Sequence, residues 1–158
     1  MKILVKKLNE KACITKFEQG DWFDLSFVEP ITIKKGTVTH IPLGIAMKLP
    51  KGMEALMLPR HSTPLKRGFI LANSVGVIDN SYCGDTDEWQ FPAYSIRNVN
   101  IEPDENPYNN RICQFKIVPS QKATIFQKLK WLFSRKIKFV YVDNLNTKAR
   151  GEFSTDKQ

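Results

Sequence analysis

The sequence lacks any apolar run of the ~18 residues that a membrane-spanning helix needs, so it predicts no membrane span. Its N-terminal stretch, MKILVKKLNEKACITKFEQ, turns polar too early for a secretory signal peptide. Histidine is scarce, with only His40 and His61, and the three cysteines form no CxxC pair. These absences argue against a transition-metal cluster and against a disulfide framework. Together they favour a cytoplasmic protein.

The chain has 158 residues, and 42% of them are hydrophobic, which suits a single domain with one core. Its net charge is +8. A basic surface attracts nucleic acids, anionic lipids or phosphorylated small molecules, and charge alone does not choose among them. The charge is uneven, because residues 127–138 (QKLKWLFSRKIK) are strongly basic and residues 85–88 (DTDE) are acidic.

Apolar residues alternate with polar ones in several short segments, which is the period of a β-strand. The segments are VTHIPLGIAMKLP (38–50), MEALMLP (53–59), RICQFKIV (111–118) and IKFVYVD (137–143). Turn signals such as KKG, PKG and EPDENP separate the runs. Many short strands predict an all-β barrel or sandwich.

One segment, TIFQKLKWLFSRKIK, has helical periodicity instead. Phe126, Leu129, Leu132 and Phe133 fall on one face of such a helix, with Trp131 near the edge of the apolar stripe. The simplest interpretation is a short surface helix whose apolar face packs on the barrel. Docking to a protein partner or to a membrane surface remains the alternative.

Polar residues that suit a phosphorylated ligand are concentrated in four segments, GDWFDLSF, LPRHST, ANSVGVIDNSYCGD and NNRICQF. Arginine grips phosphate oxygens, amides supply donors and acceptors, and carboxylates accept protons. The candidate residues are Asp24, Arg60, His61, Ser62, Asn73, Asp79, Tyr82, Arg111 and Gln114. They fall at the predicted ends of strands, where side chains from different strands can meet.

These segments resemble the motifs of the trimeric dUTPase family in their order along the chain. NSVGVIDNSYCGD resembles the third motif, Gly-x-Ile-Asp-x-x-Tyr-x-Gly, while GDWFDLSF, PRHST and NRICQ are similar to the first, second and fourth. ARGEFSTDKQ is similar to the fifth motif, and DEWQFPAYSIRN to a branch found in some bacteria and their phages. The resemblance extends from about residue 21 to residue 118, with a weaker match at the tail.

The resemblance implies a jelly-roll-like distorted β-barrel, a homotrimer with active sites at subunit boundaries, and hydrolysis of dUTP to dUMP and pyrophosphate with Mg²⁺. It implies one β domain over residues 1–145, which includes a basic insertion near residues 126–136. Residues 146–158 are then expected to form a flexible C-terminal arm. The insertion is foreign to the family pattern and is a candidate site for a protein partner.

The third motif carries the chemistry in this comparison. Asp79 is expected to deprotonate a water that attacks the α-phosphorus, although the same residue can also stabilise a turn. Tyr82 is expected to lie under the deoxyribose and exclude a 2′-hydroxyl by a clash. Asn73 is expected to bind the uracil edge, which offers both donors and acceptors.

The other motifs are expected to hold the phosphates and the metal. The resemblance assigns Arg60 and Gln114 to phosphate contacts, with Arg111 beside them or bracing the strand through an ion pair. Asp24 is expected to hold a water of the Mg²⁺ shell. Arg150 is expected to reach the phosphates from the tail, and Phe153 to cap the base.

The motifs also depart from the family pattern. His61 stands where the second motif has a serine, so Ser62 replaces that serine only if the loop shifts, and Asn109 and Asn110 replace a Gly-Asp pair. The fifth motif keeps only Gly151, and Gln90 stands where the related branch has an aromatic residue. The alternative hypotheses are therefore a pseudoenzyme that binds a nucleotide or a protein with little turnover, or a basic nucleic-acid binder. The related dCTP deaminases are disfavoured because the spacing of Asp and Tyr matches the hydrolase motif.

Overall fold

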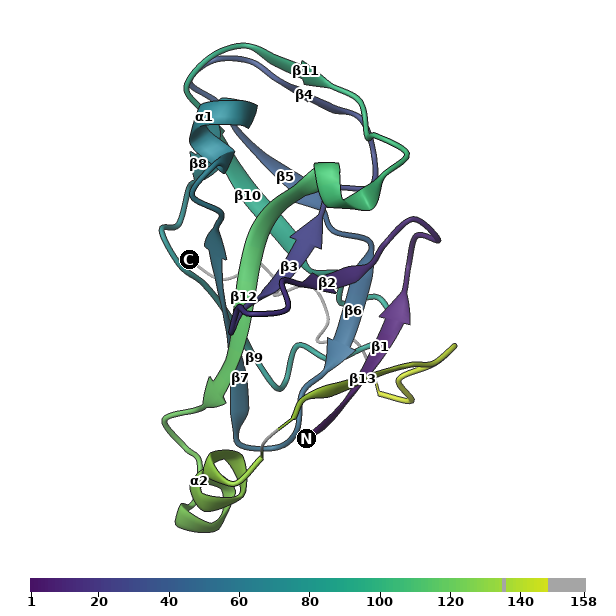
Figure 1. Ribbon diagram of the computed structural model, residues 1–158, viewed down its shortest axis with the longest axis vertical. Coiled ribbons are helices and arrows are strands. Elements are labelled where there is room, and N and C mark those ends of the chain that lie inside the picture. The colour runs from purple at the N-terminus through teal and green to yellow at the C-terminus, as the bar shows by residue number, and fades with distance from the viewer. Residues whose placement is uncertain (135, 148–158) are drawn as a thin grey trace, which may run out of the picture.

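Short strands, most of them paired in antiparallel fashion, form the body of the fold (Figure 1). The computed structural model describes residues 1–134 and 136–147. The strands are β1 (Lys2–Lys7), β2 (Ile14–Lys16), β3 (Phe23–Ser26), β4 (Ile31–Ile33), β5 (Val38–Pro42), β6 (Ile45–Lys48), β7 (Met53–Pro59), β8 (Phe69–Leu71), β9 (Gly76–Asp79), β10 (Gln90–Ser95), β11 (Val99–Ile101), β12 (Arg111–Pro119) and β13 (Lys138–Tyr141). The helices are α1 (Thr63–Arg67), α2 (Ile125–Leu132) and a 3₁₀ turn over Pro107–Asn110. The all-β prediction is confirmed.

The largest sheet has the strand order β2-β3-β12-β7-β9. Its two long strands, β7 and β12, alternate as their sequences predict, so that Met57 and its partner Phe115 point into the core and are buried. The opposite face carries Leu58 paired with Gln114 and Leu56 paired with Lys116, and all four of these side chains are at least partly exposed. This outward face therefore presents both polar groups and apolar surface.

Three smaller sheets, β13-β1-β6, β5-β10-β8 and β11-β4, complete the fold. The core between the sheets is rich in aromatic residues. Trp89 meets Phe115 edge-on with ring centroids 5.2 Å apart, and Phe69 meets Phe91 at 5.8 Å. Such tilted pairs add specific contacts to the burial of apolar surface. The loop that leads into β10 is thereby anchored to the largest sheet.

The alternating segment at residues 38–50 forms two strands, β5 and β6, and not one. The chain breaks at Leu43 and Gly44, and Gly44 has φ +69°, a conformation that favours glycine. A Cβ at Gly44 would lie 2.9 Å from the Cβ of Ala12, so the break also lets the N-terminal segment pack closely. Alternation alone did not reveal the break because Leu43 is buried like its strand neighbours.

The helix predicted in the basic insertion is present as α2, but its expected orientation is wrong. Its apolar face does not pack on the barrel, because Phe126 is 84% exposed and Phe133 is 76% exposed. Trp131 makes the contact instead and donates a hydrogen bond from Nε1 to the Ile117 carbonyl at 3.0 Å. The side chain of Gln127 fills the space where a Cβ at Gly52 would lie. The amphipathic helix thus presents its apolar side to solvent.

The segment after β13 is held beside the loop that follows β9. Leu145 is 1% exposed, and its N–H donates to Asp85 Oδ1 at 2.7 Å. The Thr147 hydroxyl donates to the Cys83 carbonyl at 2.5 Å. The arm expected over residues 146–158 therefore starts next to the loop after β9. Arg150 and Phe153 lie outside the described residues.

Within residues 1–134 and 136–147, no helix is long and apolar enough to cross a membrane.

Candidate active site in two parts

A pocket of about 240 Å³ opens beside β9 and the turn that connects it to β8. Asn73, Asp79 and Tyr82 all line it, so the structure brings together the three residues singled out in the third motif. The turn before β9 contains Ser74 at φ 63°, and the Val75 N–H donates to the Asn73 carbonyl at 2.6 Å. This tight turn places Asn73 at the mouth of the pocket.

Asp79 is the last residue of β9 and stabilises the turn that follows. The Ser81 N–H and hydroxyl both donate to Asp79 Oδ1, at 2.7 and 2.5 Å. The Tyr82 N–H donates to the Asp79 carbonyl at 3.2 Å. The turn role and the catalytic role are therefore compatible, because these bonds fix the orientation of a half-buried carboxylate in a pocket.

Tyr82 forms a rigid wall of the same pocket. Its hydroxyl donates to the Glu88 carbonyl at 2.9 Å, and its ring packs against the core. Burial raises the pKa of the Tyr82 phenol, and the carboxylates of Asp87 and Glu88 add to the shift. The phenol is therefore neutral at pH 7, and the fixed ring offers an uncharged flat surface.

Sequence analysis did not assign His40 and Glu88 to this pocket, although both line it with Gln90. The signal is the pairing of β5 with β10, in which Pro92 lies opposite His40 and Gln90 opposite Pro42. This pairing joins segments that are distant in the chain, so local alternation could not reveal it. Gln90, which the sequence comparison singled out, lines the same pocket.

A second cluster lies at the other end of the largest sheet. Asp24 on β3 is 6% exposed and contacts two guanidinium groups, Nε of Arg60 at 3.4 Å and a terminal nitrogen of Arg111 at 3.1 Å. Gln114 pairs with Asp24 across the strands and donates weakly to the Pro59 carbonyl at 3.4 Å. The predicted bracing role of Arg111 is thus observed. Positive charge and an amide converge here as phosphate binding requires.

His61 and Ser62 border this second cluster through the turn between β7 and α1. Thr63 is buried, and its hydroxyl donates to the Ile112 carbonyl at 2.6 Å, which fixes the end of the turn. His61 is exposed and Ser62 is partly buried without a side-chain cap on α1. Both residues therefore follow Arg60 directly in the turn between β7 and α1.

The two parts of the site are too far apart to meet within one chain. At one end of the sheet, Asp24 on β3 lies opposite Gln114 on β12, which in turn lies opposite Leu58 on β7. Asp79 on β9 lies opposite Glu54, which is four residues from Leu58 along β7. At ~3.3 Å per residue this offset is about 13 Å along the strands, and three strand spacings of ~4.8 Å add about 14 Å across them. Asp24 and Asp79 are consequently about 20 Å apart.

The described residues contain no group of three His, Cys, Asp or Glu side chains that could hold a metal directly. Asp24 has both of its oxygens facing arginines, so it does not suit direct ligation. Magnesium keeps several waters and binds substrate phosphates, and a buried carboxylate can accept a hydrogen bond from such a water. The residues therefore fit an indirect magnesium contact and not a protein-only metal cage.

Comparison with known proteins reveals a consistent set of relatives. The sequence profile of the dUTPase family matches residues 10–132. The SPbeta prophage-derived deoxyuridine 5′-triphosphate nucleotidohydrolase of Bacillus subtilis strain 168 is 48% identical over 124 residues, which cover 78% of this chain and 84% of the relative. The enzyme of the same name from Hydrogenobaculum sp. strain Y04AAS1 is 35% identical over 130 residues, covering 80% and 86%.

Solved structures share the fold. The dUTPase of Streptococcus mutans superposes with a TM-score of 0.64 at 23% identity, covering 73% of this chain and 91% of that one. A mutant dUTPase from phage phi11 of S. aureus, described for its coordination of a structural Mg(II) ion, gives a TM-score of 0.60 at 16% identity, covering 78% and 94%. The predicted jelly-roll-like fold is confirmed by these similarities.

Proposed function

The chain belongs to the dUTPase family, the family of dUTP diphosphatases, and we propose that it hydrolyses dUTP to dUMP and pyrophosphate. The observation that carries the proposal is the shared pocket of Asn73, Asp79 and Tyr82. It combines an amide for the base, a flat ring for the sugar and an oriented carboxylate for a water.

The proposed reaction is an in-line attack of water on the α-phosphorus. Asp79 accepts a proton from the attacking water, a bond forms between the water oxygen and the α-phosphorus, and the bond from that phosphorus to the bridging oxygen breaks. Pyrophosphate carries away the electron pair of the broken bond. The hydrogen bonds from Ser81 support this role because they hold the carboxylate in one orientation before substrate binds.

Tyr82 supports discrimination against ribonucleotides. Its ring is fixed at both ends, by packing on the core and by the hydrogen bond to Glu88. A rigid wall cannot retreat from an additional 2′-hydroxyl, so a ribose there would clash. Asn73, at the pocket mouth, has the donor and acceptor that the imide face of uracil needs.

We propose that the phosphates are bound by the second cluster of a neighbouring copy of the chain. The α- and γ-phosphorus atoms of one nucleotide are only two P–O–P bridges apart, far less than the ~20 Å that separates the two parts of the site in one chain. The sheet face between them carries the exposed Val77 next to the partly exposed Leu56. Apolar surface of this kind suits a contact between copies. In a closed trimer every copy can supply the second cluster to the pocket of its neighbour, so all sites are completed in the same way.

Magnesium is proposed as the cofactor, with Asp24 accepting a hydrogen bond from one of its waters. When bound, the ion neutralises charge on the triphosphate and orients it. Arg60, with Arg111 and Gln114 beside it, binds the phosphate oxygens. His61 and Ser62 border this cluster and are proposed to contact the same phosphates as the turn closes on them.

Pyrophosphate release from dUTP, compared with dCTP, dTTP and UTP in the presence of magnesium, tests the proposal. Asp79→Asn should lower kcat about 10²–10⁴-fold, the usual contribution of a general base, and should leave dUTP binding measurable by calorimetry. Asp143→Asn is the matched control, because Asp143 is exposed and lies in neither part of the site. Binding of dUTP to the wild-type chain without pyrophosphate release would instead indicate a pseudoenzyme.

A further inference from the structure

The outward side of α2 is an apolar strip on a helix that is held rigidly from behind. Trp131 and Gln127 fix the inner side, and Thr124 and Gln127 form a reciprocal capping box at the first turn. At 3.6 residues per turn the exposed apolar residues span an arc of about 120°. These residues, defined here as the α2 strip, are Ile125, Phe126, Leu129, Leu132 and Phe133, and they are 44–84% exposed.

Positive charge borders the α2 strip on both sides. On the same helical projection Lys128 and Lys130 fall at its two edges. Residues 106–142 contain no Asp or Glu at all and eight basic residues. Long lysine side chains can lie along an apolar surface while their charged ends stay in water. The charge pattern therefore suits a partner that is acidic around an apolar face.

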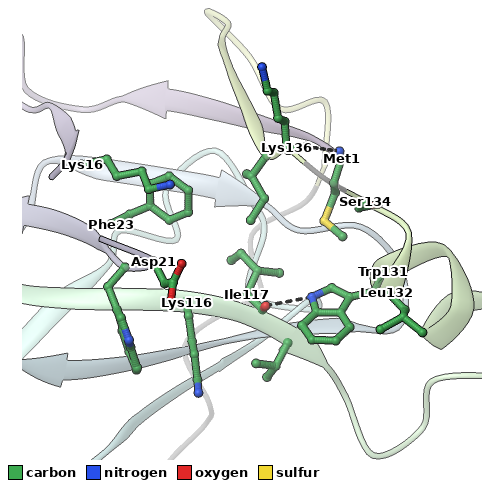
Figure 2. A pocket seen from close by; sticks show the side chains of 13 residues that line it. Met1, Lys16, Asp21, Phe23, Lys116, Ile117, Trp131, Leu132, Ser134 and Lys136 are labelled. Carbon is green, nitrogen blue, oxygen red and sulfur yellow. Dashed lines mark hydrogen bonds between the residues drawn. The ribbon is translucent and has the colours of Figure 1, made fainter. Parts of the chain in front are cut away.

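At Leu132 the α2 strip borders a groove of about 820 Å³ between the helix and the largest sheet. Leu132 and Trp131 form one wall of the groove, and Phe23 lies on the opposite side, as Figure 2 shows. The groove is bordered by Lys16, Lys116 and Lys136, against the single carboxylate of Asp21. An apolar interior with a cationic border thus extends from the outside of the helix into a concave surface.

This concave shape decides between two kinds of anionic partner. A lipid surface is flat and can cover the convex α2 strip, but it cannot enter the groove beside it. An amphipathic polypeptide segment can fill the groove with apolar side chains and place carboxylates at the lysines, in the helix-in-groove mode of recognition. The two Trp side chains that line the groove, Trp22 and Trp131, are residues enriched at such interfaces.

We infer that the α2 strip and the adjoining groove form a docking site for an acidic amphipathic segment of another protein. None of the strip residues lines either of the two pockets that Asp79 borders. Docking and dUTP hydrolysis are therefore separable by mutation.

The probe is a synthetic helical peptide with Leu and Phe on one face and Glu on the other, and the comparison peptide carries Lys in place of Glu. Binding is followed by tryptophan fluorescence, because Trp22 and Trp131 line the groove while Trp89 is buried. We expect the Glu peptide to bind and the Lys peptide not to bind. Phe126→Glu should weaken binding at least about tenfold, as truncation of an interface anchor does.

Matched variants separate the docking site from general effects of charge and exposure. Lys136→Glu, at the groove, should weaken binding of the Glu peptide at least about tenfold. Lys35→Glu, in the turn between β4 and β5, should leave that binding unchanged. Leu65→Glu matches Phe126→Glu, since Leu65 is a 71% exposed apolar residue on α1. Figure 1 places α1 and α2 at opposite ends of the molecule. Phe126→Glu should retain full dUTP hydrolysis, which shows that the variant is folded.

Four results would overturn the inference. Equal binding of the two peptides, or binding of neither, would rule out an acidic segment as the partner. Sedimentation with phosphatidylserine vesicles that depends on Phe126, without binding of the Glu peptide, would assign the α2 strip to lipid. A change in the number of subunits on Phe126→Glu, measured by light scattering, would show that the strip is a contact between copies of the chain.

Discussion

Mixing two impaired variants should raise hydrolysis above that of either one if each site is shared between two copies of the chain. Asp79→Asn disables the first part of the site, and Arg60→Ala disables the second. The two parts are about 20 Å apart in one chain by strand register, so neither chain can use its own Arg60 beside its own Asp79. In mixed assemblies, however, an intact Asp79 of one chain meets an intact Arg60 of another.

The expected recovery follows from random assembly. When equal amounts of the two variants are unfolded together and refolded, half of the chains carry an intact Asp79 and half an intact Arg60. About a quarter of all sites then combine both, so activity should return to about 25% of wild type. Asp79→Asn alone should fall about 10²–10⁴-fold. Arg60→Ala alone should fall about 10–100-fold, because a charged hydrogen bond contributes ~1.5–3 kcal/mol.

A second mixture provides the control. Wild-type chains refolded with the double variant Asp79→Asn/Arg60→Ala should also retain about a quarter of the sites if these are shared, but about half if each site lies in one chain. Pyrophosphate release at saturating dUTP and magnesium measures both mixtures. No recovery in the first mixture, together with half activity in the second, would refute the shared site.

Three further predictions follow from individual contacts. Tyr82→Ala should raise kcat/KM for UTP relative to dUTP by at least about tenfold, because the wall against the ribose is removed; Tyr82→Phe, which keeps the ring, is the control in the same pyrophosphate assay. Trp131→Phe should lower the free energy of unfolding by about 1 kcal/mol through loss of the bond to Ile117 and should speed amide exchange within α2, whereas Trp131→Ala should cost more. The hydrogen bond from the Leu145 N–H, with Lys6 beside it, lowers the pKa of the Asp85 carboxyl below its usual value of 3.8, so attachment of the C-terminal segment should be complete above pH ~4 and lost as pH falls through the lowered pKa. An NMR titration of the Leu145 amide measures this loss, and an unchanged resonance down to pH ~2 would contradict it.

The central strands were predictable because their sequences alternate over their full lengths. MEALMLP forms β7 without a change of boundary, and RICQFKIV extends by only one residue to give β12. The pairing of β12 with β3 then positions Gln114 opposite Asp24. The contents of the pocket were predicted in part: Asn73, Asp79 and Tyr82 are close in sequence and meet there. His40 joins them through the long-range pairing of β5 and β10, which no local period encodes.

The orientation of α2 shows a separate limit of sequence patterns. An amphipathic pattern predicts that a helix has an apolar and a polar face, but it does not predict which face packs against the rest of the chain. Here one hydrogen bond from Trp131 and the close fit of Gln127 against Gly52 fix the mixed face inward. With that face fixed, Phe126 and Phe133 can only point to solvent. An exposed apolar strip of this size is unfavourable unless something covers it. The periodicity that predicted packing on the barrel therefore argues, once the inner contacts are known, for packing on another molecule.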